Sequence, residues 1–335
     1  MPSAAPYQHE MEVGRQAVKA AMDVSRRIQK DVSSLRTLTK NDRSPVTIAD
    51  FAAQALVCKA LSTHFPDIPI VAEEDSLAIR KPENREIFTQ IIHYLKIIDA
   101  SLDETRICDL IDLGGAEPDG TFWTLDPIDG TKGFLRGEQF AVALALVREG
   151  QVRLGILGCP NLPADCPAGA CGTLFWAIQG QGSWKDFGSD GGASYAPIRT
   201  SGKTDPRQMK FVESYESSHS DKDTQLEISR RLQISSPPEQ MDSQVKYGIV
   251  AAGIADIYLR IPNPATLDYR EKIWDHAAGC LIVEEAGGRV SDIDGKKLDF
   301  SVGKTLRRNR GILASNGPVH SRVLEIVAAL AGRKK

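Results

Sequence analysis

Asp126 and Asp129 stand three residues apart, and this spacing allows both carboxylates to face one ligand. The apolar run over 121–125 predicts a buried strand, and the proline and glycine that follow it predict a tight loop. Two carboxylates at the end of such a strand repel each other and lose hydration, and a bound divalent cation removes both costs. The alternative for two such residues alone is a surface turn, which Asp-Pro and Asp-Gly pairs also favour.

Other acidic residues also stand where a predicted element begins or ends. Thr47 is a good helix N-cap, and Asp50 three residues later completes a capping-box pattern. The apolar strand predicted over 68–72 runs directly into the acids 73–75, and Asp275 precedes a predicted helix. Each has a purely structural alternative, because Asp50 and Asp275 could cap helices and three acids in a row are typical of a solvated turn.

Together these acids form a set of oxygen donors without a matching set of histidines and cysteines: Asp50, Glu73, Asp126, Asp129 and Asp275. Hard cations, magnesium first, prefer such ligands. Two ions about 3.5–4 Å apart can stabilise both the attacking and the leaving oxygen of a phosphoryl displacement. Gly130, Thr131 and the amides that follow could receive the phosphate oxygens, as helix N-termini do.

Composition and charge exclude several other functions. The chain has 335 residues, 41% of them hydrophobic and 25% charged, which is ordinary for a globular protein. A net charge of −3 predicts no nucleic-acid or anionic-membrane partner. The longest apolar run, 140–147, is too short to cross a bilayer, and the N-terminus does not match a secretory signal. The six scattered cysteines fit a reducing compartment, so we expect a cytoplasmic location, with the nucleus as the alternative.

Hydrophobic periodicity predicts a mixed α+β / α/β fold in two lobes. In the N-terminal lobe, 1–200, early helices precede a meander of strands, so its sheet should be largely antiparallel. The smaller C-terminal lobe, 201–335, has the strand–helix–strand order of an α/β layer. Four details are also predicted: a surface loop over 186–208, a helix over 244–255 capped by Asp242-Ser243, a helix over 276–286, and a hairpin over 289–300.

Four segments in order resemble one known family. Asp126-Pro-Ile-Asp-Gly-Thr131 resembles the central signature of the metal-dependent, lithium-sensitive phosphatases related to inositol monophosphatase. The other three are Ser44-Pro-Val-Thr-Ile-Ala-Asp50, Ala72-Glu-Glu-Asp75 and Trp274-Asp-His-Ala-Ala-Gly279. The resemblance spans about 40–290, and it implies a layered αβαβα fold of the sugar-phosphatase type.

The resemblance also implies how the ions are bound. One Mg²⁺ would lie on Glu73, Asp126 and the carbonyl of Ile128, and another would be shared by Asp126, Asp129 and Asp275. A third, weaker ion is expected near Glu73, whose neighbour Glu74 would support the ligands. The matching catalytic residues are Thr131 and Asp50, which would orient and deprotonate the attacking water.

The second lobe carries cationic residues on three different elements, His219, Lys246 and Arg260. Taken singly, each could be an ordinary surface charge. The segments 213–219, 242–247 and 258–260 resemble the nucleotide contacts of the 3'(2'),5'-bisphosphate nucleotidases. In that branch, positive groups hold the 5'-phosphate while the 3'-phosphate is hydrolysed. The resemblance implies these substrate-binding residues: Gly130, Thr131, His219, Ser243, Lys246, Arg260 and Asp275.

The function implied is a magnesium-dependent phosphatase that converts adenosine 3',5'-bisphosphate to AMP and phosphate. Activity on phosphoadenosine phosphosulfate is also expected, which would connect the protein to sulfur assimilation and salt tolerance. Inhibition by Li⁺ or Na⁺ is expected from the family. Two alternatives remain: the same fold acting on inositol phosphates or fructose 1,6-bisphosphate, and a catalytically silent nucleotide-binding sensor. Every acidic position of the pattern is filled, which disfavours the sensor.

Overall fold

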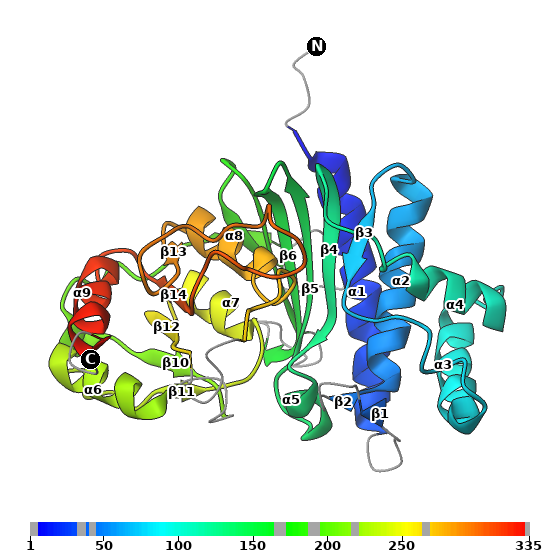
Figure 1. The fold of residues 1–335 in the computed structure, drawn as a ribbon, viewed down its shortest axis with the longest axis horizontal. Helices are drawn as coiled ribbons and strands as arrows, with labels where there is room; N and C mark the ends of the chain where they lie inside the picture. The colour runs from blue at the N-terminus through cyan, green and yellow to red at the C-terminus, as the bar shows by residue number, and fades with distance from the viewer. Residues whose placement is uncertain are drawn as a thin grey trace.

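The computed structural model describes residues 6–31, 38–39, 45–163, 172–186, 195–215, 221–262 and 269–331. Within these ranges the chain forms two large sheets with helices outside and between them (Figure 1). From one side to the other, the layers are helices, a seven-stranded sheet, helices, a five-stranded sheet, and helices. This order confirms the expected αβαβα arrangement. No helix in the described parts of the chain is long and apolar enough to span a membrane.

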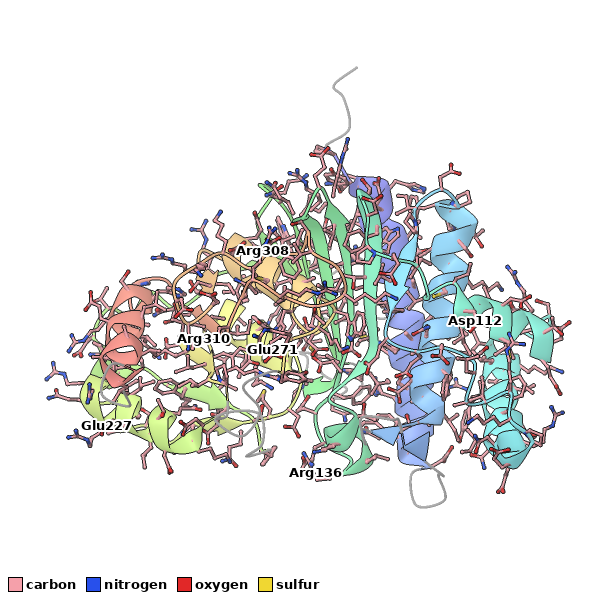
Figure 2. All side chains as sticks on the ribbon, viewed as in Figure 1. Asp112, Arg136, Glu227, Glu271, Arg308 and Arg310 are labelled. Carbon is pink, nitrogen blue, oxygen red and sulfur yellow. The ribbon has the colours of Figure 1, made fainter. Side chains whose placement is uncertain are left out.

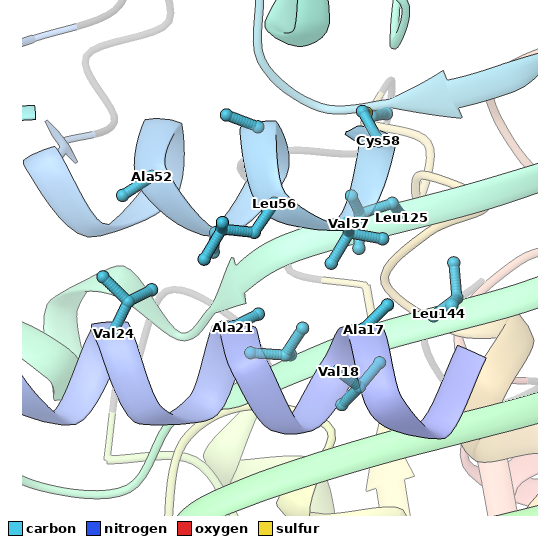
Figure 3. Close-up of a cluster of buried hydrophobic side chains, with 14 of the residues drawn as sticks. Ala17, Val18, Ala21, Val24, Ala52, Leu56, Val57, Cys58, Leu125 and Leu144 are labelled. Carbon is cyan, nitrogen blue, oxygen red and sulfur yellow. The ribbon is translucent and has the colours of Figure 1, made fainter. Parts of the chain in front are cut away.

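The first helical layer packs on one face of the seven-stranded sheet. It consists of α1 (Gln8–Lys30) and α2 (Ile48–His64), with α3 (Arg85–Ile98) and α4 (Glu104–Asp112) outside them. Small and branched side chains such as Ala21 and Val24 on α1 and Ala52 and Leu56 on α2 fill the interface (Figure 3). Small residues let the axes of α1 and α2 approach closely. α2 also packs on β4, so it is held between its neighbouring helix and the sheet. The 3₁₀ turn η2 (Pro82–Asn84) leads into α3.

The seven-stranded sheet has the order β3-β4-β5-β6-β7-β8-β9. Only the β3–β4 pair is parallel among these described strands, which confirms a largely antiparallel sheet. The strands are β3 (Ile70–Ala72), β4 (Thr121–Asp129), β5 (Ala141–Arg148), β6 (Gln151–Pro163), β7 (Gly172–Ile178), β8 (Ser183–Asp186) and β9 (Tyr195–Ile198). A separate two-stranded ladder joins β1 (Leu38–Thr39) to β2 (Pro45–Val46).

Two sequence-based boundaries in this sheet are wrong. The central strand does not stop before Asp126, because β4 pairs with β5 as far as Asp129, with a register shift between the two aspartates. The irregularity places both carboxylates within the strand end rather than in a free loop. The predicted loop over 186–208 also contains a strand, β9, which extends the sheet by pairing with β8. The 3₁₀ turn η3 (Pro206–Gln208) follows it.

The five-stranded sheet has the order β11-β10-β12-β14-β13. Its strands are β10 (Phe211–Glu213), β11 (Glu239–Gln240), β12 (Ile257–Arg260), β13 (Arg289–Ser291) and β14 (Ile312–Ser315). β10 is parallel to both β11 and β12, as an α/β layer requires. The predicted hairpin over 289–300 is wrong, since β13 pairs with β14. All four residues of β14 are buried, so the backbone polar groups on both of its edges need partners, and β12 and β13 supply them.

Helices fill the space between the sheets and cover the outer face. α7 (Val245–Ala251) and α8 (Ala277–Glu285) contact strands of both sheets, and α6 (Lys222–Leu232) packs with α9 (His320–Ala331) outside. α7 ends four residues earlier than predicted, ahead of Gly253 with its φ of 71°. Because one buried apolar cluster includes residues of both sheets, we propose 1–200 and 201–335 as lobes of one packed molecule.

Candidate active site

A pocket of about 230 Å³ lies where the end of β4 meets the segments that precede α7 and α8. It brings together nearly all residues proposed from the sequence as metal ligands or substrate contacts. Its lining includes Glu73, Asp126, Ile128, Asp129, Gly130, Thr131, Ser243, Lys246, Arg260 and Asp275. His219 lies outside the described residues. Glu73 and Asp275, which are 202 positions apart in the sequence, therefore line one cavity.

The end of β4 is shaped by short local contacts. Asp126 Oδ1 accepts a hydrogen bond from the N–H of Ile128 at 3.2 Å, and Thr131 Oγ1 donates to the Ile128 carbonyl at 3.2 Å. Gly130 then adopts a φ of 87° and starts the short helix α5 (Thr131–Leu135). A Cβ at Gly130 would lie 2.9 Å from the Cβ of Ser243, so only glycine allows this turn to approach the second lobe.

Three carboxylates of the pocket, Asp126, Asp129 and Asp275, have raised pKa values. Burial and the charges of Glu73, Asp129 and Asp275 raise the pKa of Asp126 well above its ordinary value. Burial and the charges of Asp129, Glu73 and Glu271 raise the pKa of Asp275 well above its ordinary value, although Arg260 opposes them. Burial raises the pKa of Asp129 to about 6, although Lys246 and the Gln244 N–H oppose it. So many carboxylates close together in a buried pocket favour a bound cation.

The donor set fits magnesium. It consists of the carboxylates of Glu73, Asp126, Asp129 and Asp275 together with the Ile128 carbonyl, all lining the same pocket. Hard divalent cations prefer such oxygen ligands. Asp275 does not cap α8, whose N-cap residue is His276, so its carboxylate remains available to the pocket.

Asp50 is held rigidly by Thr47 and is not among the residues that line the pocket. Its Oδ2 accepts hydrogen bonds from the N–H of Thr47 at 2.7 Å and from Thr47 Oγ1 at 2.6 Å, so the predicted capping box is present. The Asp50 charge also contributes to the raised pKa of Asp126. The capping role is therefore confirmed. The catalytic role of Asp50 with Thr131 stays a prediction.

Gln54 is a structural contributor that the sequence reasoning missed. The side chain is fully buried on α2, and its Oε1 accepts from the N–H of Glu74 at 3.1 Å. Its Nε2 donates to the carbonyls of Glu74 at 2.7 Å and of Ile111 at 2.8 Å. Gln54 thus fixes the main chain next to Glu73, and the carboxamide in an otherwise apolar helix segment was the available signal. The supporting role proposed for the Glu74 carboxylate stays a prediction.

The pocket is also lined by two largely buried cations, Lys246 and Arg260. Lys246 Nζ donates to the Met241 carbonyl at 3.3 Å and lies 5.3 Å from the centre of the Tyr258 ring. Burial lowers the pKa of Lys246 to about 8, although the charge of Asp129 partly opposes it. Arg260 Nε pairs with Glu271 Oε1 at 2.8 Å. Lys246 and Arg260 line the same pocket as the carboxylates, and we call these two cations its basic wall and the carboxylates its acidic wall.

The segment before α7 differs from its predicted capping role. The Asp242 carboxylate pairs with Arg136 instead of capping the helix, which begins after Gln244. Ser243 has a φ of 69°, unusual for a residue other than glycine, and its Oγ accepts from the N–H of Val245 at 3.3 Å. This conformation brings Ser243 against Gly130 at the lining of the pocket.

His276 also lines the pocket and was not predicted as a site residue. Donor atoms of Glu271, Asp275 and His276 all lie within 4.8 Å of one another, a grouping that could hold a metal. Both ring nitrogens of His276 are already hydrogen-bonded, however, to Tyr247 Oη at 2.8 Å and to Glu271 Oε2 at 3.2 Å. These contacts make His276 part of a hydrogen-bonded network at the lining of the pocket rather than a metal ligand.

Comparison with known proteins agrees with this geometry. A model of the inositol monophosphatase family matches residues 7–331. The chain belongs to the inositol monophosphatase family. Solved structures similar to this family member include the extragenic suppressor protein suhB of Bartonella henselae, with a TM-score of 0.66, 22% identity and coverage of 96% and 98% of the two chains. The IMPase of Thermotoga maritima gives a TM-score of 0.65 at 20% identity, covering 97% and 98%. These two likenesses concern the fold alone.

More similar relatives of this inositol monophosphatase family member are named 3'(2'),5'-bisphosphate nucleotidases. The protein of that name numbered 1 from Candida albicans is 40% identical, over 97% of this chain and 96% of its own. Those of Schizosaccharomyces pombe and Oryza sativa are each 40% identical, covering 95% and 96% of this chain respectively and 94% of their own lengths. The identity therefore extends over nearly the whole chain.

Proposed function

We propose that the chain is a Mg²⁺-dependent phosphatase that hydrolyses the 3'-phosphate of adenosine 3',5'-bisphosphate to yield AMP and phosphate. The observation that carries the proposal is the composition of the pocket lining, which combines clustered carboxylates with the cations Lys246 and Arg260. A substrate with a second phosphate fits the basic wall, whereas inositol monophosphate has no second anion to place there. The names of relatives at 40% identity support the same substrate class.

The acidic wall would hold the metal. Glu73, Asp126, Asp129, Asp275 and the Ile128 carbonyl would bind two Mg²⁺ ions, with a third, weaker ion beside Glu73. When bound, Mg²⁺ supplies charge stabilisation for the phosphoryl group and lowers the pKa of coordinated water. The four carboxylates and the carbonyl supply the donor oxygens.

The remaining groups would position the substrate and move the proton. Gly130 and Thr131 stand at the start of α5, where backbone N–H groups can bind the oxygens of the 3'-phosphate. Thr131 would orient a water molecule, and Asp50 would accept its proton as the water oxygen bonds to phosphorus. The bond between phosphorus and the 3'-oxygen then breaks, and the leaving oxygen takes up a proton. Ser243, Lys246, Arg260 and His219 would hold the 5'-phosphate.

A phosphate-release assay on a substrate panel tests the proposal. The panel contains adenosine 3',5'-bisphosphate, phosphoadenosine phosphosulfate, inositol 1-phosphate and fructose 1,6-bisphosphate, each with and without Mg²⁺. We expect release to require Mg²⁺ and to be fastest with the two nucleotides. Faster release from an inositol phosphate would assign a different substrate to this pocket. Binding of the nucleotide without any release would indicate a sensor instead of an enzyme.

Lithium and sodium inhibition is a separate part of the proposal. A small monovalent cation can compete for a carboxylate cluster whose charge is already high. We expect the initial rate at limiting Mg²⁺ to fall along a Li⁺ titration, with potassium as the control salt for ionic strength. An unchanged rate across the titration would contradict the expectation.

We further propose a cytosolic location, with the nucleus as the alternative. The cysteines within the described residues, Cys58, Cys108, Cys159 and Cys280, are buried free thiols, which suits a reducing compartment. Imaging of a fluorescent fusion tests this, and retention in the secretory pathway would contradict it.

A further inference from the structure

A continuous set of hydrogen bonds and ion pairs connects three residues that line the pocket, Tyr247, His276 and Arg260, through Glu271. Tyr247 Oη bonds to His276 Nδ1 at 2.8 Å, and His276 Nε2 bonds to Glu271 Oε2 at 3.2 Å. The other oxygen of the same carboxylate, Glu271 Oε1, pairs with Arg260 Nε at 2.8 Å. Figure 2 labels Glu271 toward the middle of the molecule. The single carboxylate of Glu271 therefore joins a buried histidine to a cation of the pocket.

This pairing constrains the arginine at one defined atom. An acceptor on Nε limits rotation of the planar guanidinium about its aliphatic stem, and the planar group offers its donors in fixed directions. The side chains of Arg260 and Glu271 are only 16% and 12% exposed, so water competes weakly for the bond. Burial acts against the charged form, but the charges of Glu271, Asp275 and two nearby tyrosines together outweigh it, so the pKa of Arg260 lies well above its ordinary value. Arg260 is therefore both charged and oriented before any ligand arrives.

We propose that Glu271 is a positioning residue that orients Arg260 toward the second anionic group of the substrate, the 5'-phosphate. The inference rests on the proposed function, because it concerns the basic wall of the same pocket. Glu271 acts through Arg260, and His276 with Tyr247 behind it holds the carboxylate in place. Glu271 belongs neither to the four segments that resemble the family nor to the substrate-binding residues expected from the sequence.

Two opposing effects of Glu271 can be separated experimentally. Its negative charge reduces the net positive charge near Arg260, so removal of that charge alone would strengthen attraction of a phosphate. Its acceptor oxygen orients the guanidinium, so loss of that oxygen would weaken binding of a phosphate at a fixed position. Glu271→Ala removes both charge and acceptor. Glu271→Gln removes the charge but keeps a carbonyl oxygen that can accept from Arg260 Nε.

The experiment compares kcat/KM for adenosine 3',5'-bisphosphate with kcat/KM for 3'-AMP, which lacks the 5'-phosphate. We expect Glu271→Ala to lower this ratio roughly 10-fold, the effect of losing a hydrogen bond to a charged group. The value for 3'-AMP should stay near that of the wild type, which also shows that the variant is folded. Glu271→Gln should restore the ratio to within about 3-fold of the wild type, because the acceptor is retained.

Asp186→Asn serves as the matched control. Asp186 is also a buried carboxylate paired with cations, Arg15 at 2.7 Å and Lys19 at 2.6 Å, but it lies in β8 and does not line the pocket. Its substitution should leave the ratio unchanged.

The inference is overturned if Glu271→Ala keeps or raises the ratio, since charge would then dominate over orientation. It is also overturned if Gln and Ala lower the ratio equally, or if both substrates lose activity in parallel. Failure of the proposed function looks different, because wild-type protein would then show no preference for the bisphosphate. Calorimetric binding of AMP against adenosine gives an independent reading: the wild type should prefer AMP, and Glu271→Ala should lose that preference.

Discussion

The backbone N–H of Gln244 donates a hydrogen bond of 2.6 Å to Asp129 Oδ2. Asp129 ends β4 in the seven-stranded sheet, while Gln244 directly precedes α7, which lies between the two sheets. An ion pair between Arg136 and Asp242 joins the same two segments. A carboxylate expected to bind metal therefore also fixes the segment that carries Lys246. This hydrogen bond therefore links the strand end that carries the carboxylates to the segment that carries Lys246.

Substitution Asp129→Asn separates these two roles. An asparagine carbonyl can still accept the Gln244 N–H, but the side chain no longer brings a negative charge to the cation. We expect turnover to fall on the order of 100-fold while the melting temperature stays near that of the wild type. Asp129→Ala should lower both, since it also removes the acceptor. Phosphate release at saturating Mg²⁺ and thermal unfolding measure the two effects, and near-normal turnover of Asp129→Asn would contradict the ligand role.

Substitution Asp126→Asn should stabilise the metal-free protein. The raised pKa of Asp126 means that its charged form is disfavoured in the fold, so without metal its charge reduces stability once the pH exceeds the ordinary value of 3.8. We expect the free energy of unfolding at pH 7 to rise by on the order of 1 kcal/mol without Mg²⁺. The additional stabilisation that Mg²⁺ gives the wild type should be largely lost.

Denaturant unfolding with and without Mg²⁺ provides the measurement. Asp256→Asn is the contrasting control, because this buried carboxylate pairs with Lys203 at 2.9 Å and accepts the N–H of Lys210 at 2.7 Å. The Asp256→Asn substitution should lower the free energy of unfolding both with and without Mg²⁺. A metal-free Asp126→Asn protein less stable than the wild type would show that the Asp126 charge is not under repulsion.

Substitution Gln54→Met should weaken metal binding without touching a ligand. Methionine fills a similar volume but leaves the N–H and carbonyl of Glu74 without their side-chain partner. We expect the Mg²⁺ concentration for half-maximal activity to rise roughly 10- to 100-fold and the free energy of unfolding to fall by about 1–3 kcal/mol. Gln225→Met is the control, because it removes a buried glutamine of the other lobe that donates to Glu213. In this variant the free energy of unfolding should fall, while the Mg²⁺ concentration for half-maximal activity should not change. An unaltered Mg²⁺ requirement in Gln54→Met would argue against this positioning role.

Binding of the second phosphate should weaken as the pH rises through about 8. Burial lowers the pKa of Lys246 to about 8, so the ammonium is charged at pH 7 and becomes neutral at higher pH. We expect kcat/KM for adenosine 3',5'-bisphosphate, which reports the free enzyme, to decline above this pH. Bound Mg²⁺ adds positive charge nearby and should move the midpoint lower.

The pH profile of 3'-AMP gives the control, because that substrate has no 5'-phosphate for Lys246 to bind. A guanidinium stays charged throughout, so Lys246→Arg should remove the decline even if its absolute rate is lower. Parallel profiles for the two substrates would instead place the titration in the shared chemistry of the 3'-phosphate.

Local patterns predicted most elements because each depends on near neighbours in the chain. The capping box of Thr47 and Asp50 and the antiparallel pairing of β5 with β6 are confirmed. Strand ends and partners were less predictable, as the extension of β4 to Asp129 and the pairing of β13 with β14 show. Both depend on strands that lie elsewhere in the sequence. Hydrogen bonding between distant segments outweighed the local signals of proline, aspartate and glycine.

The sequence by itself determined which side chains could bind a cation and a phosphate, because residue type and spacing carry that chemistry. Only the tertiary structure decided that Asp126 and Asp275 line one cavity. It also decided that Gln54 hydrogen-bonds to the main chain of Glu74, and that Glu271 pairs with Arg260. A carboxylate's ligand, cap or ion-pair role is set by its neighbours in space. Burial and proximity shift its pKa and select its partner, and neither is encoded in the local sequence.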